Sequence, residues 1–147
     1  MSRARSRSAA RLAAVQALYQ REMEQTPVAQ LLHEFHHHRL GATIEDAIYA
    51  DAEVAFFDDV VMGVDARLDE IDALIGANLG EGWTIERLDR ALRQILRAGS
   101  YELLARPDIP TGSVIGEYLD VAHAFFDRKE KKFVNGVLDA VAKAVRN

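Results

Sequence analysis

The sequence contains no cysteine and few prolines, three in 147 residues. Without thiols the chain cannot form a disulfide, a thiolate nucleophile or a cysteine-ligated zinc site. No apolar run approaches the roughly 18 residues of a membrane span, and the arginine-rich start lacks the apolar segment that a secretory signal requires. We therefore expect a soluble, cytoplasmic protein.

The common enzyme signatures are also missing. There is no glycine-rich phosphate loop and no nucleophile elbow, and the acidic residues are typical of the solvated sides of helices. The metal-like feature is a set of histidines, His33 and the run 36–38. A structural zinc site needs about four ligands and a catalytic one at least three, and no further ligand is placed to complete the set. We expect no catalysis, no bound metal and no cofactor.

Signals for β-strands are nearly absent, because apolar residues recur every three or four positions rather than every two. The pattern predicts an all-α fold, and 147 residues is the size of one domain. Short connections favour antiparallel neighbours, in one compact bundle or two small ones. The first helix is expected to present a core-facing stripe of Leu12, Val15, Tyr19 and Met23.

Five further helices are expected. In chain order the elements are a helix at 27–38, a loop at 39–43, one long helix at 44–79, a helix capped by Thr84 and stopped by Pro107, a helix from about 111–113, a charged connection at 127–132 and a last helix. The long helix carries apolar residues at alternating steps of three and four. Such a seam could pair two copies of the chain, although packing within one chain is the simpler interpretation.

Charge is distributed unevenly along the chain. The net charge is −5, but residues 1–21 hold five arginines and no acid, so the rest of the chain carries 13 basic against 23 acidic groups. An acidic body with a basic arm repels a polyanion everywhere except at the arm. Arg3, Arg7 and Arg11 recur every fourth residue, roughly 120° from the apolar stripe, so they could meet such a ligand while the helix stays anchored. Alternatively, the N-terminus is a disordered tail instead of part of the helix, which applies mainly to Arg3 and Arg5.

A second basic cluster, at 128–132, precedes Phe133. Lysine near a helix N-terminus opposes the helix dipole, which indicates a use, although salt bridges to Asp127 and Glu130 would also explain the cluster. Cations beside an exposed Tyr19 or Phe133 would suit single-stranded RNA, whose phosphates meet cations and whose bases stack on rings. Burial of either ring is the alternative.

Three segments resemble the NusB family of bacterial antitermination factors: A-R-L-A-A-V-Q-A-L-Y-Q at 10–20, L-D-R-A-L-R-Q-I-L-R-A-G-S-Y-E-L at 88–103 and K-F-V-N-G-V-L-D at 132–139. The resemblance implies one domain over 1–147, made of two perpendicular three-helix bundles. The basic residues 1–8 are expected to form an arm that can be flexible. It also implies a non-enzymatic partner of NusE, a small-subunit ribosomal protein. The heterodimer would bind the boxA RNA of nascent ribosomal transcripts and join the RNA polymerase antitermination complex.

The resemblance also implies RNA-binding residues. The arginine-rich N-terminus contacts RNA in the family, which transfers to Arg3, Arg5, Arg7 and Arg11. Position in the matching segments adds Gln16, Tyr19, Arg97, Lys132 and Phe133. We expect replacement of Arg7 or Arg11 by alanine to lower RNA affinity without lowering thermal stability.

Two other functions stay open. A NusB-like domain also occurs fused to ribosomal-RNA cytosine methyltransferases, but that activity needs an α/β cofactor domain and a cysteine, and this sequence has no cysteine. The other is a helical scaffold that binds no RNA and forms a homodimer through the long helix at 44–79.

Overall fold

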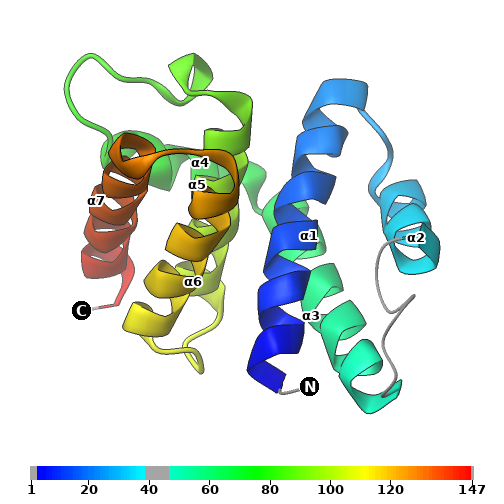
Figure 1. Ribbon diagram of the computed structural model, residues 1–147. Helices are drawn as coiled ribbons and strands as arrows, with labels where there is room; N and C mark the ends of the chain where they lie inside the picture. Colours follow the sequence, from blue (N-terminus) through cyan, green and yellow to red (C-terminus); the bar gives the residue numbers. More distant parts are fainter. Residues whose placement is uncertain (1–2, 39–46, 147) are drawn as a thin grey trace. The chain divides into compact units, whose positions relative to one another are not determined.

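The computed structural model describes the backbone of residues 3–38 and 47–146, and the side chains of 6–37 and 54–146. Over these residues the protein contains helices and turns but no strand, which confirms the predicted all-α class. The elements are α1 (Arg3–Glu24), α2 (Val28–His38), α3 (Ala47–Ala66), α4 (Leu68–Ala77), the 3₁₀ helix η1 (Ile85–Arg87), α5 (Arg90–Ala105), α6 (Thr111–Phe125) and α7 (Arg128–Val145) (Figure 1). They form two compact units, residues 1–65 and 66–147. None of the described helices is apolar over a stretch sufficient to cross a membrane.

The first unit consists of α1, α2 and α3. Phe35 of α2 stacks on Phe57 of α3 with ring centroids 5.4 Å apart. Next to this pair, Nε2 of His36 lies 2.6 Å from Oδ1 of Asp58 and links the same two helices. The predicted loop at 39–43 and the first residues of the predicted long helix lie outside the described residues.

The buried face of α1 is built mainly from alanine. The residues of α1 that form it are Ala10, Ala13, Ala14, Val15, Ala17 and Leu18. The predicted stripe is therefore correct only at Val15, since Tyr19 is 40% and Met23 47% exposed. The larger apolar residues Tyr19 and Met23 thus lie outside the buried face.

The predicted single helix at 44–79 is wrong, because it is divided at Arg67. That residue has φ −117° and ψ 26°, outside the helical region, between α3 and α4. Apolar residues before the break, such as Val64, belong to the first unit, and Ile71 and Ile75 belong to the second. The apolar positions that look like one continuous seam in the sequence therefore belong to two separate hydrophobic cores.

The break is marked by a local ion pair. The Arg67 guanidinium donates to Glu70 at 2.8 and 3.1 Å. These hydrogen bonds lower the pKa of Glu70 and raise that of Arg67 relative to their ordinary values. Asp69 and Glu70 also place negative charge in the first turn of α4, where it favours the positive end of the helix dipole.

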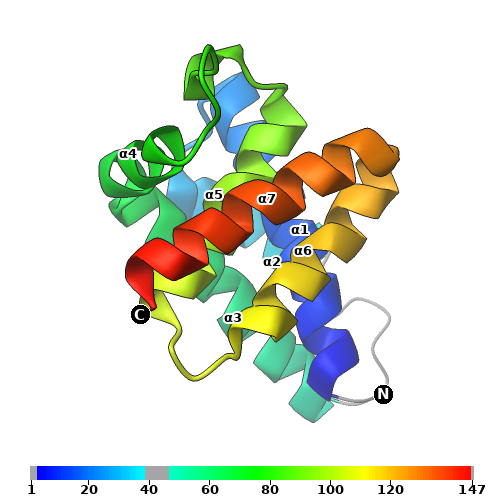
Figure 2. The same ribbon diagram turned by 90° about the vertical axis from the view of Figure 1, so that its left-hand side faces the viewer.

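In the second unit α5 is the central helix. It packs against α4, α6 and α7, and α6 packs against α7 (Figures 1 and 2). Gly99 lies where α5 approaches the other two: a Cβ at this position would stand 3.0 and 3.1 Å from the Leu138 methyl carbons and 3.4 Å from a Tyr118 ring carbon. The close approach of the three helices therefore requires a residue without a side chain.

Helix ends in this unit differ from prediction in two places. Thr84 makes no side-chain cap; Asp89 caps α5 instead, with Oδ1 accepting from the backbone N–H groups of Ala91 (2.8 Å) and Leu92 (3.2 Å). The predicted connection at 127–132 is instead mostly helical, since α7 begins at Arg128. The predicted start of α6 near Thr111 is confirmed.

Arg146 ties the end of α7 to the end of α5. Its guanidinium donates to the carbonyl oxygens of Leu103 (2.8 Å), Glu102 (3.1 Å) and Arg106 (2.7 Å), at the last turn of α5. It also donates to the carbonyl oxygen of Ile109 at 2.7 Å. The Glu102 and Arg106 carbonyls also accept from backbone N–H groups, so for these two the guanidinium is a second donor. A guanidinium can supply several donors at once.

We expect the same substitution to act in opposite directions at two glycines. Gly99→Ala should lower the free energy of unfolding by about 1 kcal/mol. The new methyl would stand 3.0 Å from a methyl carbon of buried Leu138, and this overlap costs more free energy than the higher helix propensity of alanine contributes. Gly116→Ala, in α6 where a Cβ meets nothing within 4 Å, should raise it by roughly 0.5–1 kcal/mol. Urea unfolding followed by tryptophan emission measures both, and equal signs would contradict this account.

Arg146→Ala should lower the free energy of unfolding of the second unit by about 2–4 kcal/mol, because it removes the side-chain donor of the Leu103 and Ile109 carbonyls and the second donor of the Glu102 and Arg106 carbonyls. The matched control is Lys143→Ala in the same last turn, where an exposed pair with Asp139 at 3.0 Å is removed. That change should cost less than about 0.5 kcal/mol. A similar small loss for Arg146→Ala in the same urea titration would show that the hydrogen bonds carry little of the stability.

Candidate nucleic-acid interface

Two arginines of α1, Arg7 and Arg11, face a phenylalanine of α3. The guanidinium carbons of Arg7 and Arg11 lie 4.9 and 4.8 Å from the centroid of the Phe56 ring, within the range of a cation–π contact. Arg11 is only 3% exposed. The expectation that it projects away from the core is therefore wrong, because the buried face of α1 is not the predicted one. Arg3 and Arg5 lie in α1, with side chains outside the described set.

Gln16 and Tyr19 form a second part of α1 that faces outward. Both are exposed, and at a spacing of three residues they lie on one side of the helix. Met23, a further turn along, is exposed on the same side. The structure thus brings together the predicted RNA-binding pair Gln16 and Tyr19 and leaves the tyrosine ring open to solvent.

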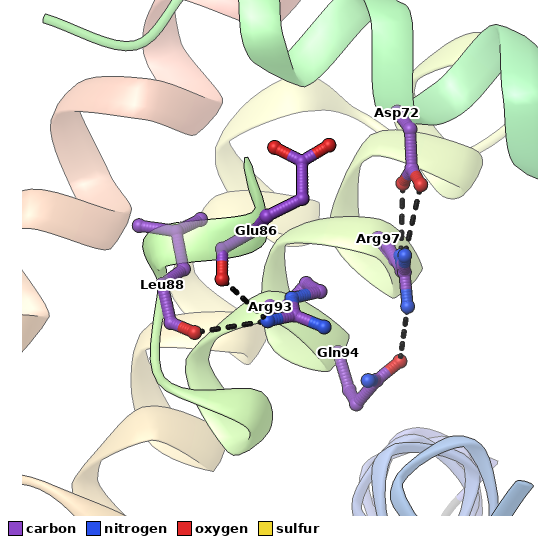
Figure 3. Close-up of polar contacts among 6 residues, drawn as sticks. All are labelled: Asp72, Glu86, Leu88, Arg93, Gln94 and Arg97. Atoms are coloured by element: carbon purple, nitrogen blue, oxygen red, sulfur yellow. Dashed lines mark hydrogen bonds and ion pairs between the residues drawn. The ribbon is translucent and has the colours of Figure 1, made fainter. Parts of the chain in front are cut away.

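Arg97 is engaged inside the second unit. Its Nε and Nη2 each donate to a different carboxylate oxygen of Asp72 at 2.8 Å, and Nη1 donates to Gln94 Oε1 at 3.3 Å (Figure 3). Such a two-point pair is among the strong charge-assisted contacts and joins α5 to α4. The geometry assigns Arg97 to packing, and a contact with RNA remains a prediction.

One turn before Arg97, Arg93 holds the preceding loop against α5. Its Nη2 donates to the carbonyl oxygens of Glu86 (3.2 Å) and Leu88 (3.1 Å), as Figure 3 shows. These bonds connect η1 to α5 and set the position of the loop that carries Trp83.

Cationic side chains gather along one side of the first turns of α7. Arg128, Lys131, Lys132 and Asn135 occupy positions i, i+3, i+4 and i+7, one face of a helix. Together with Leu119, His123, Phe126 and Asp127 they line a groove of about 530 Å³, called here the basic groove. The predicted site residue Lys132 is exposed in it. This arrangement depends on helical geometry, which the expected irregular connection would not supply.

A second groove lies beside the same turns of α7. This aromatic groove, of about 330 Å³, is lined by Trp83, Arg87, Leu88, Asp89, Leu92, Phe126, Lys129, Glu130 and Phe133. The rings of Trp83 and Phe133 are 6.1 Å apart and tilted by 54°. Sequence reasoning found Phe133 but missed Trp83 and Arg87. The available signal was a tryptophan directly after G-E-G, which is typical of an exposed turn.

The histidines of α2 interact locally. The His33 and His37 rings lie 4.3 Å apart, while His36 pairs with Asp58. Among the described side chains no three histidine or acidic residues come together in a way that could hold an ion.

Fold and site together define the class: an all-helical protein that carries a basic groove and an aromatic groove on its described residues. Comparison with known proteins specifies it further. The sequence profile of the NusB family matches residues 8–143. The chain is 70% identical to the transcription antitermination protein NusB of Sphingopyxis alaskensis, and the match covers 98% of this chain and 97% of that protein. It is 69% identical to the NusB of Novosphingobium aromaticivorans, and that match covers 97% of this chain and 96% of the relative. The chain belongs to the NusB family, whose members are transcription antitermination factors and not enzymes.

Solved structures show the same fold. NusB of T. maritima is 34% identical with a TM-score of 0.76, over 97% of this chain and 92% of that one. A NusB crystallised with NusE and double-stranded RNA is 29% identical with a TM-score of 0.78, over 95% and 98%.

The buried position of Arg11 changes the stability expected of its variant. Arg11→Ala should lower the free energy of unfolding of the first unit by about 1–2 kcal/mol, because it removes a desolvated cation from the Phe56 ring. Gln16→Ala, exposed on the same helix, is the control and should change it by less than about 0.5 kcal/mol. Chemical unfolding followed by far-ultraviolet circular dichroism measures both, and an unchanged Arg11→Ala would show that this arginine contributes nothing to the fold.

Proposed function

We propose that this chain binds the boxA RNA of nascent ribosomal transcripts as a heterodimer with NusE, and that the pair joins the RNA polymerase antitermination complex in the cytoplasm. The observation that carries the proposal is the basic groove, because it concentrates Arg128, Lys131 and Lys132 on one helix face. Family membership supports it, as does a relative of the same fold crystallised with NusE and RNA.

Charge determines how such a protein would work. Outside residues 1–21 the chain has 13 basic and 23 acidic groups, so most of its surface repels a polyanion. Cations at the start of α1 and in the basic groove would contact phosphates, and exposed Tyr19 offers a ring for a base. A partner must supply further contacts, so binding by the chain alone is weak and becomes tight with NusE.

The scaffold alternative loses its structural basis. It required one continuous seam along 44–79, but α3 and α4 are separate helices. Val61, Val64, Ile71 and Ile75 of that seam are buried, so they offer no exposed face to a second copy.

The proposal predicts salt-dependent binding. If about four to six phosphates are neutralised, the logarithm of the affinity for a labelled boxA-type RNA should fall against the logarithm of salt with a slope near −3 to −4. Fluorescence anisotropy with and without NusE, at several salt concentrations, measures it, with a base-scrambled RNA as the specificity control. No binding in any of these conditions would refute the function.

A double variant, Lys131→Ala with Lys132→Ala, tests the groove itself. It should weaken binding and make the slope shallower by about 0.7 for each phosphate that is no longer neutralised, with unfolding unchanged. Lys143→Ala removes a lysine from the far end of the same helix and controls for net charge. Equal weakening per removed charge in the two variants would mean that overall charge, rather than the groove, drives binding.

A further inference from the structure

We propose that the aromatic groove receives one unstacked base of a single-stranded RNA, with Trp83 as the stacking platform. The inference rests on the proposed function, and to the predicted residue Phe133 it adds Trp83 and Arg87, which lie outside the three sequence segments and outside the predicted site. Trp83, Arg87 and Phe133 carry it.

The backbone presents Trp83 through a tight turn. The N–H of Trp83 donates to the carbonyl oxygen of Gly80 at 3.1 Å, which closes a four-residue turn. Gly82 stands third in this turn with φ +84°, the position that requires a positive φ in a type II turn and therefore favours glycine. The turn leaves the indole 49% exposed although it is the largest apolar side chain of the protein.

The indole is nevertheless held in place. The guanidinium carbon of Arg87 lies 5.7 Å from the centroid of the Trp83 ring, and Arg87 Nη1 donates to the carbonyl oxygen of Gly82 at 2.7 Å. Phe133 flanks the same ring from α7 at 6.1 Å. A platform fixed before the ligand arrives loses little conformational entropy on binding. Aromatic rings and guanidinium planes are the surfaces on which unstacked RNA bases rest.

The two grooves differ in charge in the way that the base and the phosphate of a nucleotide differ. In the aromatic groove Arg87 and Lys129 are balanced by Asp89 and Glu130, and Asp89 is already engaged as the cap of α5. This groove is therefore near neutral and suits an uncharged base.

The basic groove has the opposite character. Arg128, Lys131 and Lys132 face a single carboxylate, that of Asp127, so the groove is cationic and suits a phosphate. Phe126 lines both grooves, which makes them neighbours on either side of the first turns of α7. An apolar protein segment would use the ring but has no need of the cations, so the pair of grooves favours RNA.

Trp83 is the only tryptophan in the sequence, so its emission reports this groove alone. Titration of the full chain with a boxA-type single-stranded RNA should quench that emission with the same midpoint as the rise in anisotropy of the labelled RNA. An RNA series with one abasic position at a time should contain one position whose removal abolishes the quenching, and this arm requires no change to the protein.

Variants provide a second test. Trp83→Ala should weaken RNA binding by about 5-fold to 150-fold, the range for loss of one base–aromatic stack, and Trp83→Phe should restore most of it. Thr84→Ala, in the same loop and exposed, is the matched control and should bind as the unmodified chain does. Circular dichroism confirms that each variant is folded.

The possible failures are distinguishable. RNA that binds without changing Trp83 emission, and binds Trp83→Ala equally well, would overturn this inference and leave the proposed function standing. Quenching by a tryptophan-free NusE variant rather than by RNA would overturn it in favour of a protein site. Absence of RNA binding by any readout, with NusE present, would remove the proposed function and this inference together.

Discussion

The contact on which the second unit depends is the crossing of α5, α6 and α7 at Gly99. The missing side chain lets Leu138 and Tyr118 pack directly on the α5 backbone, and both are fully buried. Beside this crossing the Tyr118 hydroxyl donates to the carboxylate of Glu102, so the buried acid of α5 has a partner on α6. Because α7 is one rigid helix, the register set at Leu138 also fixes where its first turns lie, and those turns carry both grooves.

Three of the arginines occupy enclosed positions in the fold. Arg97 pairs with Asp72 at two points, Arg11 stacks on Phe56, and Arg146 donates to the carbonyls that end α5. A planar guanidinium with several donors suits such enclosed positions. Lysine is instead a flexible, strongly hydrated charge, and Lys131 and Lys132 are placed in the basic groove. A count of basic residues therefore overstates the charge available to RNA.

A few residues hold the aromatic groove in position. Arg93 fastens the loop before α5 through the carbonyls of Glu86 and Leu88, and Gly82 allows the turn that exposes Trp83. Asp89 starts α5 by capping it. Local hydrogen bonds, rather than a large core, thus hold the aromatic groove in shape, which suits a surface that must stay open to a ligand.

The sequence by itself determined the helical class, the start of α6 near Thr111, the uneven charge and the family, because periodicity, proline and short motifs act locally. Candidate residues such as Tyr19 and Lys132 could also be named and lie exposed. Tertiary structure alone decided which face of α1 is buried, where the long apolar seam divides at Arg67, and that Arg97 meets Asp72, 25 residues away. A helical repeat shows that a face is apolar but not which core it joins, and pairing between distant residues depends on packing that no local pattern encodes.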